Sequence, residues 1–371
     1  MKIVVVYASS GAGHQKAAEA LFKVLCGRRE VTARLIDSLE YTTPLFHLLY
    51  PRFYLFLVRH LPLIWGFFYD GLNFTLIGPL LRRLRRGLNA MNGKRLEKFF
   101  LTEKPEVIVS THFFATEVAS QLKEKGKLNS RLITVITDLA IHSVWMAPRV
   151  DEYVVGAVDT QEALVRRGVP EDKISLLGIP IDPVFEKEEE RSAVAKKLGI
   201  SHETFTVLVA SGGFGVGPIG LLVSRLSRNA ELQLLVVCGH NCSLYRRLEE
   251  RTALLKERVF LYGFVGNIHE LMSASDCMVS KSGGLTMSEA LAKKLPTFIL
   301  YPIPGQETGN RDVLARHRAA IPVRNIPDLE KRFEDLNRLR HDLMEVKDHI
   351  ETFRQPRSAE RIAAFILGNR P

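Results

Sequence analysis

Residues 2–26 read KIVVVYASSGAGHQKAAEALFKVLC, and this stretch decides the fold class. The segment Lys2–Ala8 is rich in valine, which is typical of a strand buried on both faces. A glycine-rich turn follows, and from about His14 to Cys26 apolar residues recur at helical spacing. A buried strand, a tight turn and an amphipathic helix begin a βαβ unit. The sequence therefore predicts an α/β fold built on parallel sheets.

The same alternation continues along the chain. Further strands of the first half are expected at Val31–Asp37, Glu106–Ser110, Leu132–Thr137, Glu152–Val155 and Ile174–Leu177. The prolines of GIPIDPVF (178–185) and the charged run that follows mark a linker, after which the pattern restarts. Strands of the second half are expected at Phe205–Ala210, Leu232–Cys238, Val259–Tyr262, Cys277–Ser280 and Thr297–Leu300. We expect two Rossmann-like, doubly wound domains facing a cleft, 1–180 and 181–371, with a C-terminal helix that can return to the first.

Size and composition exclude several classes of protein. The chain has 371 residues, 46% of them hydrophobic, which is too long for one ordinary core and too apolar for a disordered protein. Four cysteines are too few for a disulfide scaffold and favour a reducing compartment. The start of the chain reads as a strand rather than a secretory leader. The apolar stretches Leu61–Tyr69 and Gly71–Leu81 are each too short to span a bilayer. A net charge of +10 indicates an anionic partner.

The first glycine turn, SSGAGH (9–14), joins a strand to a helix, where backbone N–H groups can form an anion or ligand site. It is neither a dinucleotide fingerprint nor a P-loop, so a tight turn without a ligand is the alternative. His14 lies at the helix N-terminus, which disfavours its charged form, and at the sheet edge where ligands bind. It is a candidate proton acceptor, with a capping or packing histidine as the alternative.

A second glycine loop, SGGFGVG (211–217), lies at the same kind of junction in the second half. Two such loops, one per half, suggest a ligand between the domains. The segment CGHNC (238–242) lacks four ligands at zinc spacing, and we predict no metal.

Residues 276–310, DCMVSKSGGLTMSEALAKKLPTFILYPIPGQETGN, are the most informative block. A strand ends in KSGG, and a helix begins at about Leu285 with Glu289 on its first turns. Small residues at a helix start can hold a diphosphate, and one carboxylate can accept both hydroxyls of a ribose. The polar turn GQETGN (305–310) offers amides and a carboxylate to sugar hydroxyls. Helix capping and a solvated loop are the alternative for each piece taken alone.

Seven segments occur in an order that resembles a known family: SSGAGH, TDLAIHSVW, GIPIDPVF, SGGFG, GFVGNIHELMSASD, KSGGLTMSEA and GQETGN. They are similar to the monogalactosyldiacylglycerol synthases of plastids and the bacterial processive diacylglycerol glucosyltransferases of glycosyltransferase family 28. The likeness covers about residues 1–320 and extends more distantly to the transferase that completes lipid II. It implies the glycosyltransferase-B fold. It also implies an inverting, metal-independent transfer of a hexose from a UDP-sugar donor to the hydroxyl of a diacylglycerol acceptor, with no cofactor.

The resemblance also assigns roles to matching positions. His14 would be the base on the acceptor side, and Asp138 would either orient that base or act as a cap. Val265 would meet the uracil through its backbone, and Glu289 would hold the ribose. The diphosphate would be lined by Gly212, Gly213, Ser282, Gly283, Gly284 and Thr286. The transferred sugar would be held by Gln306, Glu307 and Asn310. The family usually has a more acidic and aromatic run after the Asp, where this chain has Leu-Ala-Ile (139–141).

Three other functions fit parts of this pattern. A lipid II-forming UDP-N-acetylglucosamine transferase would be expected to carry Gly-Thr-Gly-Gly-His where this chain has Ser10-Gly-Ala-Gly-His14. A UDP-sugar epimerase would share the fold. A non-catalytic nucleotide-sugar or lipid-binding protein would keep the pockets but lose the base, and the joint presence of His14, Glu289 and Gln306 argues against it.

The segment 41–95 indicates a membrane surface. Eleven aromatic residues lie within 41–74, and between Arg52 and Arg95 there are eight Lys or Arg and one acid, Asp70. Aromatic residues beside a basic cluster are what an interfacial anchor requires. The candidate membrane contacts are Trp65, Phe67, Phe68, Arg82, Arg83, Arg85 and Arg86. We expect a peripheral protein on anionic lipids at the cytoplasmic face of the cell membrane. A helical hairpin buried against the first domain is the alternative, and no motif supports nucleic acid as a partner.

Overall fold

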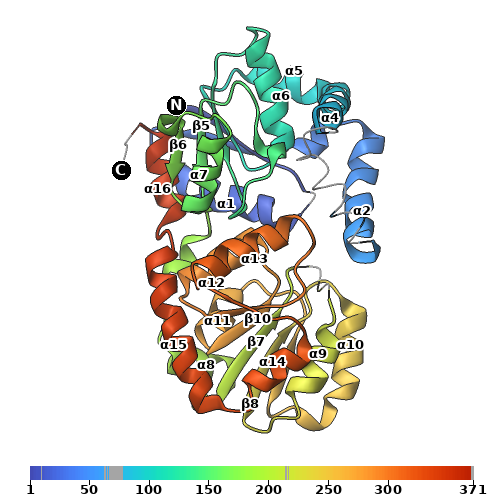
Figure 1. Ribbon diagram of the computed structural model, residues 1–371. Coiled ribbons are helices and arrows are strands. Elements are labelled where there is room, and N and C mark those ends of the chain that lie inside the picture. The colour runs from blue at the N-terminus through green and yellow to red at the C-terminus, as the bar shows by residue number, and fades with distance from the viewer. Residues whose placement is uncertain are drawn as a thin grey trace. The chain divides into compact units, whose positions relative to one another are not determined.

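A computed structural model describes residues 1–9, 11–61, 64, 66, 78–213, 215 and 217–368 of the chain (Figure 1). Two compact units result. The first comprises residues 1–183, 303–310 and 355–371, and the second comprises residues 184–302 and 311–354. The division at 183/184 lies three residues from the boundary expected from the sequence. Residues 303–310, which the sequence placed in the second domain, belong to the first unit.

The first unit contains a six-stranded, entirely parallel sheet in the order β2-β1-β3-β4-β5-β6. The strands are β1 (Lys2–Tyr7), β2 (Thr32–Asp37), β3 (Val107–Ser110), β4 (Arg131–Val135), β5 (Glu152–Val155) and β6 (Ile174–Leu176). Each corresponds to a predicted strand. Alternate residues of β1 enter two different cores, with Ile3 on one face of the sheet and Val4 on the other. This two-sided burial explains the continuous apolar run in the sequence.

Helices cover both faces of this sheet. They are α1 (Ala12–Cys26), α2 (Pro44–His60), α4 (Gly78–Asn92), α5 (Lys94–Glu103), α6 (Phe113–Glu124), α7 (Val158–Arg166) and α16 (Ser358–Ile366). Leu21 of α1 and Ile362 of α16 share one core, while Phe100 of α5 and Phe114 of α6 share the other. The C-terminal helix α16 therefore packs beside α1, as Figure 1 shows.

The second unit has a second parallel sheet, in the order β12-β11-β10-β7-β8-β9. Its strands are β7 (Phe205–Ala210), β8 (Leu232–Val237), β9 (Val259–Tyr262), β10 (Cys277–Ser280), β11 (Thr297–Ile299) and β12 (Ile321–Pro322). The sequence predicted the first five and missed the two-residue β12. The helices are α8 (Arg191–Leu198), α9 (Ile219–Leu226), α10 (Cys242–Arg251), α11 (Ile268–Ser273), α12 (Gly284–Ala292), α14 (Ile326–Arg332) and α15 (Leu336–Phe353).

One local prediction was wrong. The segment GQETGN was expected to be a polar turn, but Gln306 is the first residue of a helix, α13 (Gln306–Arg316). The carboxylate of Glu307 accepts a hydrogen bond from the backbone N–H of Ile303 at 2.8 Å. Polar residues that suit a turn also suit a helix N-terminus, where an acidic side chain is favourable.

Both sheets have the topology that builds a site at one edge. In parallel α/β sheets, ligands bind beyond the carboxyl ends of the strands, where neighbouring connections diverge. In the first unit the connections that leave β1, β3 and β4 meet there, and in the second unit those that leave β7, β8, β9 and β10. No helix among the described residues is long and apolar enough to cross a bilayer.

Candidate active site

His14 is the third residue of α1 and lies beyond the carboxyl end of β1. Its Nδ1 is 2.9 Å from the carbonyl oxygen of Thr111 and 2.8 Å from the hydroxyl oxygen of Thr137. Because a carbonyl can only accept, Nδ1 carries the proton, and the lone pair of the neutral ring lies on Nε2. The imidazole is therefore held in the tautomer that can accept a proton at Nε2.

Thr111 fixes the backbone of His14 as well as its ring. The Thr111 hydroxyl donates to the carbonyl oxygen of His14 at 2.9 Å. Thr111 directly follows β3, and Thr137 lies two residues beyond β4, so the strands that flank the site set the position of the ring. Neither threonine was predicted from the sequence as a site residue. The available signal was their position immediately after, or at the end of, a predicted strand.

Burial lowers the pKa of His14 to about 4. The rings of His112 and Trp145 contact the imidazole, with centroids 4.8 and 5.9 Å away. Burial also holds the pKa of His112 well below the usual value for histidine. A neutral His14 was predicted from the sequence, and the direction of the pKa shift is confirmed. Desolvation dominates that shift, whereas the sequence argument relied on the helix N-terminus.

Asp138 is buried and engaged away from His14. Its carboxylate accepts hydrogen bonds from Gln306 Nε2 at 2.9 and 3.0 Å, from Asn310 Nδ2 at 3.2 Å, and from the side chain of Trp145. Burial raises the pKa of Asp138, and these hydrogen bonds oppose that rise. Among the described residues, the partners of His14 Nδ1 are the two threonines and not this carboxylate. Thr111 and Thr137 therefore orient the imidazole, and Asp138 does not.

The segment 303–310 is fitted closely to the chain around Asp138. The Asn310 side-chain oxygen accepts the backbone N–H groups of Leu139 and Ala140 at 2.8 and 3.1 Å. A Cβ on Gly309 would lie 2.8 Å from the Cβ of Ala140, so glycine is required for this approach. The residues predicted to hold the transferred sugar therefore lie beside Asp138 in the first unit.

In the second unit, the loops after β7 and β8 interlock. His240 N donates to the carbonyl oxygen of Gly213 at 2.9 Å, and Asn241 Nδ2 donates to that of Gly215 at 3.2 Å. A Cβ on Gly239 would lie 2.3 Å from the carbonyl oxygen of Gly213, so only glycine fits there. The predicted diphosphate residues Gly212 and Gly213 thus belong to a backbone arrangement fixed from two strands.

The start of α12 carries residues that were predicted to bind the nucleotide diphosphate or ribose. Its N-cap, Gly283, is extended and makes no side-chain capping bond. At the end of β10, the buried hydroxyl of Ser280 has no hydrogen-bond partner in the part of the chain that the structure describes. Ser282 and Gly284 are buried, and Thr286 and Glu289 are partly buried farther along α12. Helix N-terminal N–H groups with no side-chain cap are a common phosphate site.

An exposed aromatic surface lies beyond β8 and β9. The rings of His240 and Phe264 are stacked, with centroids 4.4 Å apart and planes 14° apart. Phe264 is 58% exposed and directly precedes Val265, the residue predicted to meet the uracil. These two rings could not be paired from the sequence, because only folding brings residues 240 and 264 together.

Comparisons with known proteins match both halves of the chain. Residues 14–181 match the monogalactosyldiacylglycerol (MGDG) synthase family, and residues 207–362 match the glycosyltransferase family 28 C-terminal domain. A processive diacylglycerol beta-glucosyltransferase of Bacillus cytotoxicus is 30% identical over 275 residues, covering 74% of this chain and 70% of the relative. The Bacillus cereus protein of the same name gives the same values. The chain belongs to this family of glycosyltransferases. The family prediction is confirmed.

Solved structures show the fold of this glycosyltransferase. A UDP-GlcNAc 2-epimerase from Neisseria meningitidis, bound to UDP-GlcNAc, aligns over 100% of both chains at a TM-score of 0.63 and 15% identity. MurG from Acinetobacter baumannii aligns over 99% of this chain and 100% of its own, also at 0.63, with 13% identity. The predicted glycosyltransferase-B fold of two Rossmann-like domains is confirmed.

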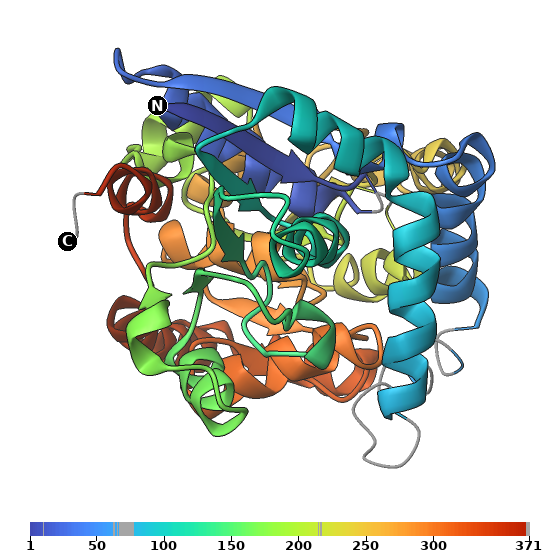
Figure 2. The same ribbon diagram turned by 90° about the horizontal axis from the view of Figure 1, so that it is seen from above.

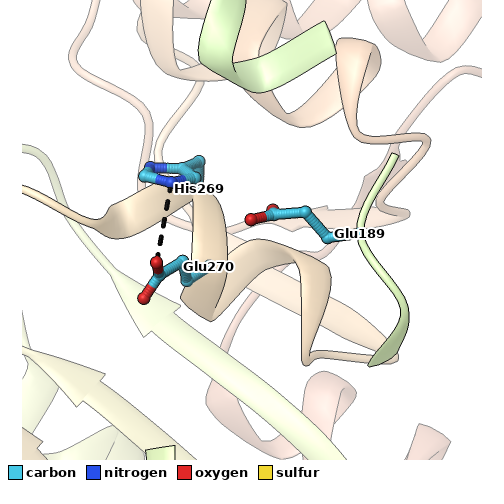
Figure 3. Close-up of side chains that lie close together, drawn as sticks. All are labelled: Glu189, His269 and Glu270. Atoms are coloured by element: carbon cyan, nitrogen blue, oxygen red, sulfur yellow. Dashed lines mark ion pairs between the residues drawn. The ribbon is translucent and has the colours of Figure 1, made fainter. Parts of the chain in front are cut away.

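Figure 3 shows a cluster of Glu189, His269 and Glu270 in this glycosyltransferase. Lysines hold both carboxylates. Lys293 and Ser273 donate to Glu189 at 2.8 and 2.7 Å, and Lys197 donates to Glu270 at 2.5 Å. These bonds lower the pKa of each glutamate. A cation would have to displace the lysines, so the cluster is an ion-pair network that ties α11 to its neighbours.

The CGHNC segment does not bring its two cysteines into one chelating group. Cys238 is buried at the end of β8, where burial raises the pKa of its thiol to about 11, whereas Cys242 is exposed at the start of α10.

The candidate membrane residues of this glycosyltransferase fall into three groups. Trp65, Phe67 and Phe68, and the side chain of Arg82, lie outside the described residues. Arg83 is exposed. Arg85 Nε and Arg86 Nε lie 3.5 and 3.6 Å from the carboxylate of Glu117, which is buried on α6. Arg85 and Arg86 of the predicted basic cluster therefore tie α4 to α6 within the first unit.

Proposed function

We propose that the protein catalyses an inverting, metal-independent transfer of a hexose from a UDP-sugar to the hydroxyl of diacylglycerol. The observation that carries this proposal is the state of His14. Its Nδ1–H is fixed by Thr111 and Thr137, and burial keeps the ring neutral, which leaves Nε2 as a proton acceptor. The names of the relatives support diacylglycerol as the acceptor.

The reaction needs one proton transfer. The acceptor hydroxyl attacks the anomeric carbon of the sugar, the bond from that carbon to the UDP oxygen breaks, and the configuration inverts. The hydroxyl proton passes to His14 Nε2 as the new bond forms, because an alcohol with a pKa far above 7 is a poor nucleophile without a base. The imidazolium that forms keeps its Nδ1–H bonded to Thr111 and Thr137.

The leaving group gathers negative charge on the diphosphate. We assign this diphosphate to the N-terminus of α12 and to the loop residues Gly212 and Gly213, because a helix N-terminus can stabilise an anion without a metal. Glu289 accepts the ribose hydroxyls. The uracil lies against the backbone of Val265, beside the stacked rings of His240 and Phe264.

The transferred sugar is assigned to Gln306, Glu307 and Asn310. Gln306 donates from Nε2 to Asp138, and we assign its Oε1 as an acceptor for a sugar hydroxyl. In this proposal Asp138 positions the sugar-binding amides rather than the base.

We propose that the enzyme works as a peripheral protein on anionic lipids at the cytoplasmic face of the cell membrane. Its acceptor remains in a bilayer, and Arg83 offers an exposed positive charge on α4. Cationic side chains near an anionic surface favour such binding.

Measurement of UDP release tests the proposed function. Purified protein is incubated with UDP-glucose or UDP-galactose, with and without diacylglycerol vesicles, and the lipid products are identified by mass spectrometry. We expect UDP release that requires diacylglycerol, together with a hexosyl lipid. Conversion of the UDP-sugar without an acceptor would instead identify an epimerase, and binding without UDP release would identify a non-catalytic protein.

A further inference from the structure

Helix α2 carries large apolar side chains on its outer side. Five of them are between 47% and 67% exposed: Leu45, Leu48, Leu49, Phe53 and Phe56. Leu45, Leu49, Phe53 and Phe56 recur at the three- and four-residue spacings that place side chains on one side of a helix, and Leu48 lies three residues after Leu45. Phe46 points elsewhere and stacks on Phe114 of α6, with ring centroids 6.2 Å apart. The helix is therefore apolar both where it packs on the first unit and where it faces outward.

Helix α4 adds exposed apolar residues next to α2. Leu88 and Met91 are 58% and 67% exposed. The Thr43 hydroxyl donates to Asn92 Oδ1 at 2.8 Å, which joins the start of α2 to the end of α4. Figures 1 and 2 both show the two helices beside each other at the edge of the first unit. A contiguous exposed apolar surface usually marks an interaction site.

Charge identifies a lipid surface as the partner. The segment 43–96 contains eight Lys or Arg and one acidic residue, Asp70. Arg83, Lys94 and Arg95 are exposed on α4 and α5, and Arg95 donates to the carbonyl oxygen of Thr42, just before α2, at 3.4 Å. Apolar residues at helical spacing, surrounded by cations and almost without acids, match the acyl boundary and the headgroups of an anionic bilayer.

We propose that α2 lies in the membrane interface with its outer apolar side at the acyl boundary, and that this contact contributes more to membrane affinity than the arginines of α4. The inference rests on the proposed function in one respect, since the acceptor would enter from the same bilayer. Two of the α4 arginines already face Glu117, and Arg85 also lies over the ring of Phe113 at 5.6 Å. Each cation near an anionic surface raises binding about fivefold, whereas burial of one Leu or Phe side chain raises it about tenfold or more.

A matched pair of triple variants tests this proposal. The first variant is L49S/F53S/F56S on α2. The control, L221S/L254S/M344S, removes three apolar side chains of the second unit that are 53%, 98% and 66% exposed. Vesicles of phosphatidylcholine alone, and with phosphatidylglycerol, are sedimented with each protein at low and high salt. We expect the α2 variant to lose about 1,000-fold in vesicle affinity, also at high salt, because burial of apolar groups is not screened. The control should sediment like the wild type.

Fold and oligomeric state are measured on the same samples. UDP titration calorimetry and thermal unfolding identify a variant that has lost its fold. Equal sedimentation of the α2 variant and the wild type would overturn the proposal. It would also be overturned if light scattering showed a wild-type dimer that the variant disrupts, with vesicle binding unchanged, because the face would then bind a second copy of the chain. Vesicle binding that depends on α2, in a protein without transferase activity, would refute the proposed function and leave this inference intact.

Discussion

Two helix N-termini in this molecule begin in the same way and carry different chemistry. Both α1 and α12 follow a parallel strand, and both have an extended glycine N-cap, Gly11 and Gly283, without a side-chain capping bond. In α1 a partly buried imidazole, His14, occupies the third position. In α12 small residues occupy the start, and the carboxylate of Glu289 comes more than a turn later. The proposed function therefore uses the same backbone element for proton transfer in one unit and for anion binding in the other, according to a few side chains.

The largest expected effect comes from removing the imidazole. His14→Ala should lower turnover by about 10²–10⁴-fold, the usual contribution of a general base. The affinity for UDP, measured by calorimetry, should stay at the wild-type value, because the residues proposed to bind the nucleotide lie in the second unit. A variant that retained turnover would reduce the turn at α1 to a structural role.

A substitution in α12 should weaken the binding of UDP. Glu289→Ala removes the acceptor for the ribose hydroxyls, and hydrogen bonds to a charged group contribute about 1.5–3 kcal/mol. UDP affinity should therefore fall by about 10- to 100-fold. Glu289→Gln, which keeps the shape and one acceptor, should lose less. An unchanged dissociation constant for Glu289→Ala would contradict the assignment of the ribose.

We expect the ion pair between Arg85 of α4 and Glu117 of α6 to stabilise the folded protein. Arg85→Ser removes one partner of the buried Glu117 carboxylate and should lower the free energy of unfolding by about 1–3 kcal/mol. Arg83→Ser, on the exposed side of the same helix, should change it by less than about 0.5 kcal/mol. Urea denaturation compares the two variants. Equal stabilities would show that Glu117 does not need Arg85.

A smaller effect distinguishes positioning of His14 from simple packing. Thr137→Val removes the hydroxyl that faces Nδ1 and should lower turnover about fivefold, from one hydrogen bond of about 1 kcal/mol. Thr137→Ser keeps the hydroxyl and should restore most of the rate, with KM for the UDP-sugar unchanged in both. If Thr137→Val keeps the rate and Thr137→Ser loses it, the methyl group and not the hydroxyl matters at this position.

The sequence was sufficient for the sheets and insufficient for the partners of the site residues. Strands buried on both faces are continuous β-branched runs, so Lys2–Ala8 and its counterparts could be located directly. Asp138 was different. Its partner Gln306 comes from a segment 168 residues later that folds with the first unit, and no local pattern encodes that return. GQETGN was taken for a turn because its polar residues suit both a turn and a helix start. The hydroxyl that fixes His14 was overlooked for a similar reason, since a threonine after a strand is common.

The pH dependence of kcat/KM tests whether a neutral, partly buried His14 accepts the proton. This quantity reports the ionisation of the free enzyme. Because burial lowers the pKa of His14 to about 4, the base is unprotonated at all higher pH values, and activity should be lost only as the pH falls toward about 4. Asp138→Asn is the control, because a carboxyl with a raised pKa could titrate in the same region, and this variant should keep the acidic limb in place. Circular dichroism at each pH verifies that the protein is folded. We predict that kcat/KM stays constant as the pH falls to about 5 and decreases only below that pH. A limb near pH 6.5, the usual value for histidine, or one that disappears in Asp138→Asn, would contradict it.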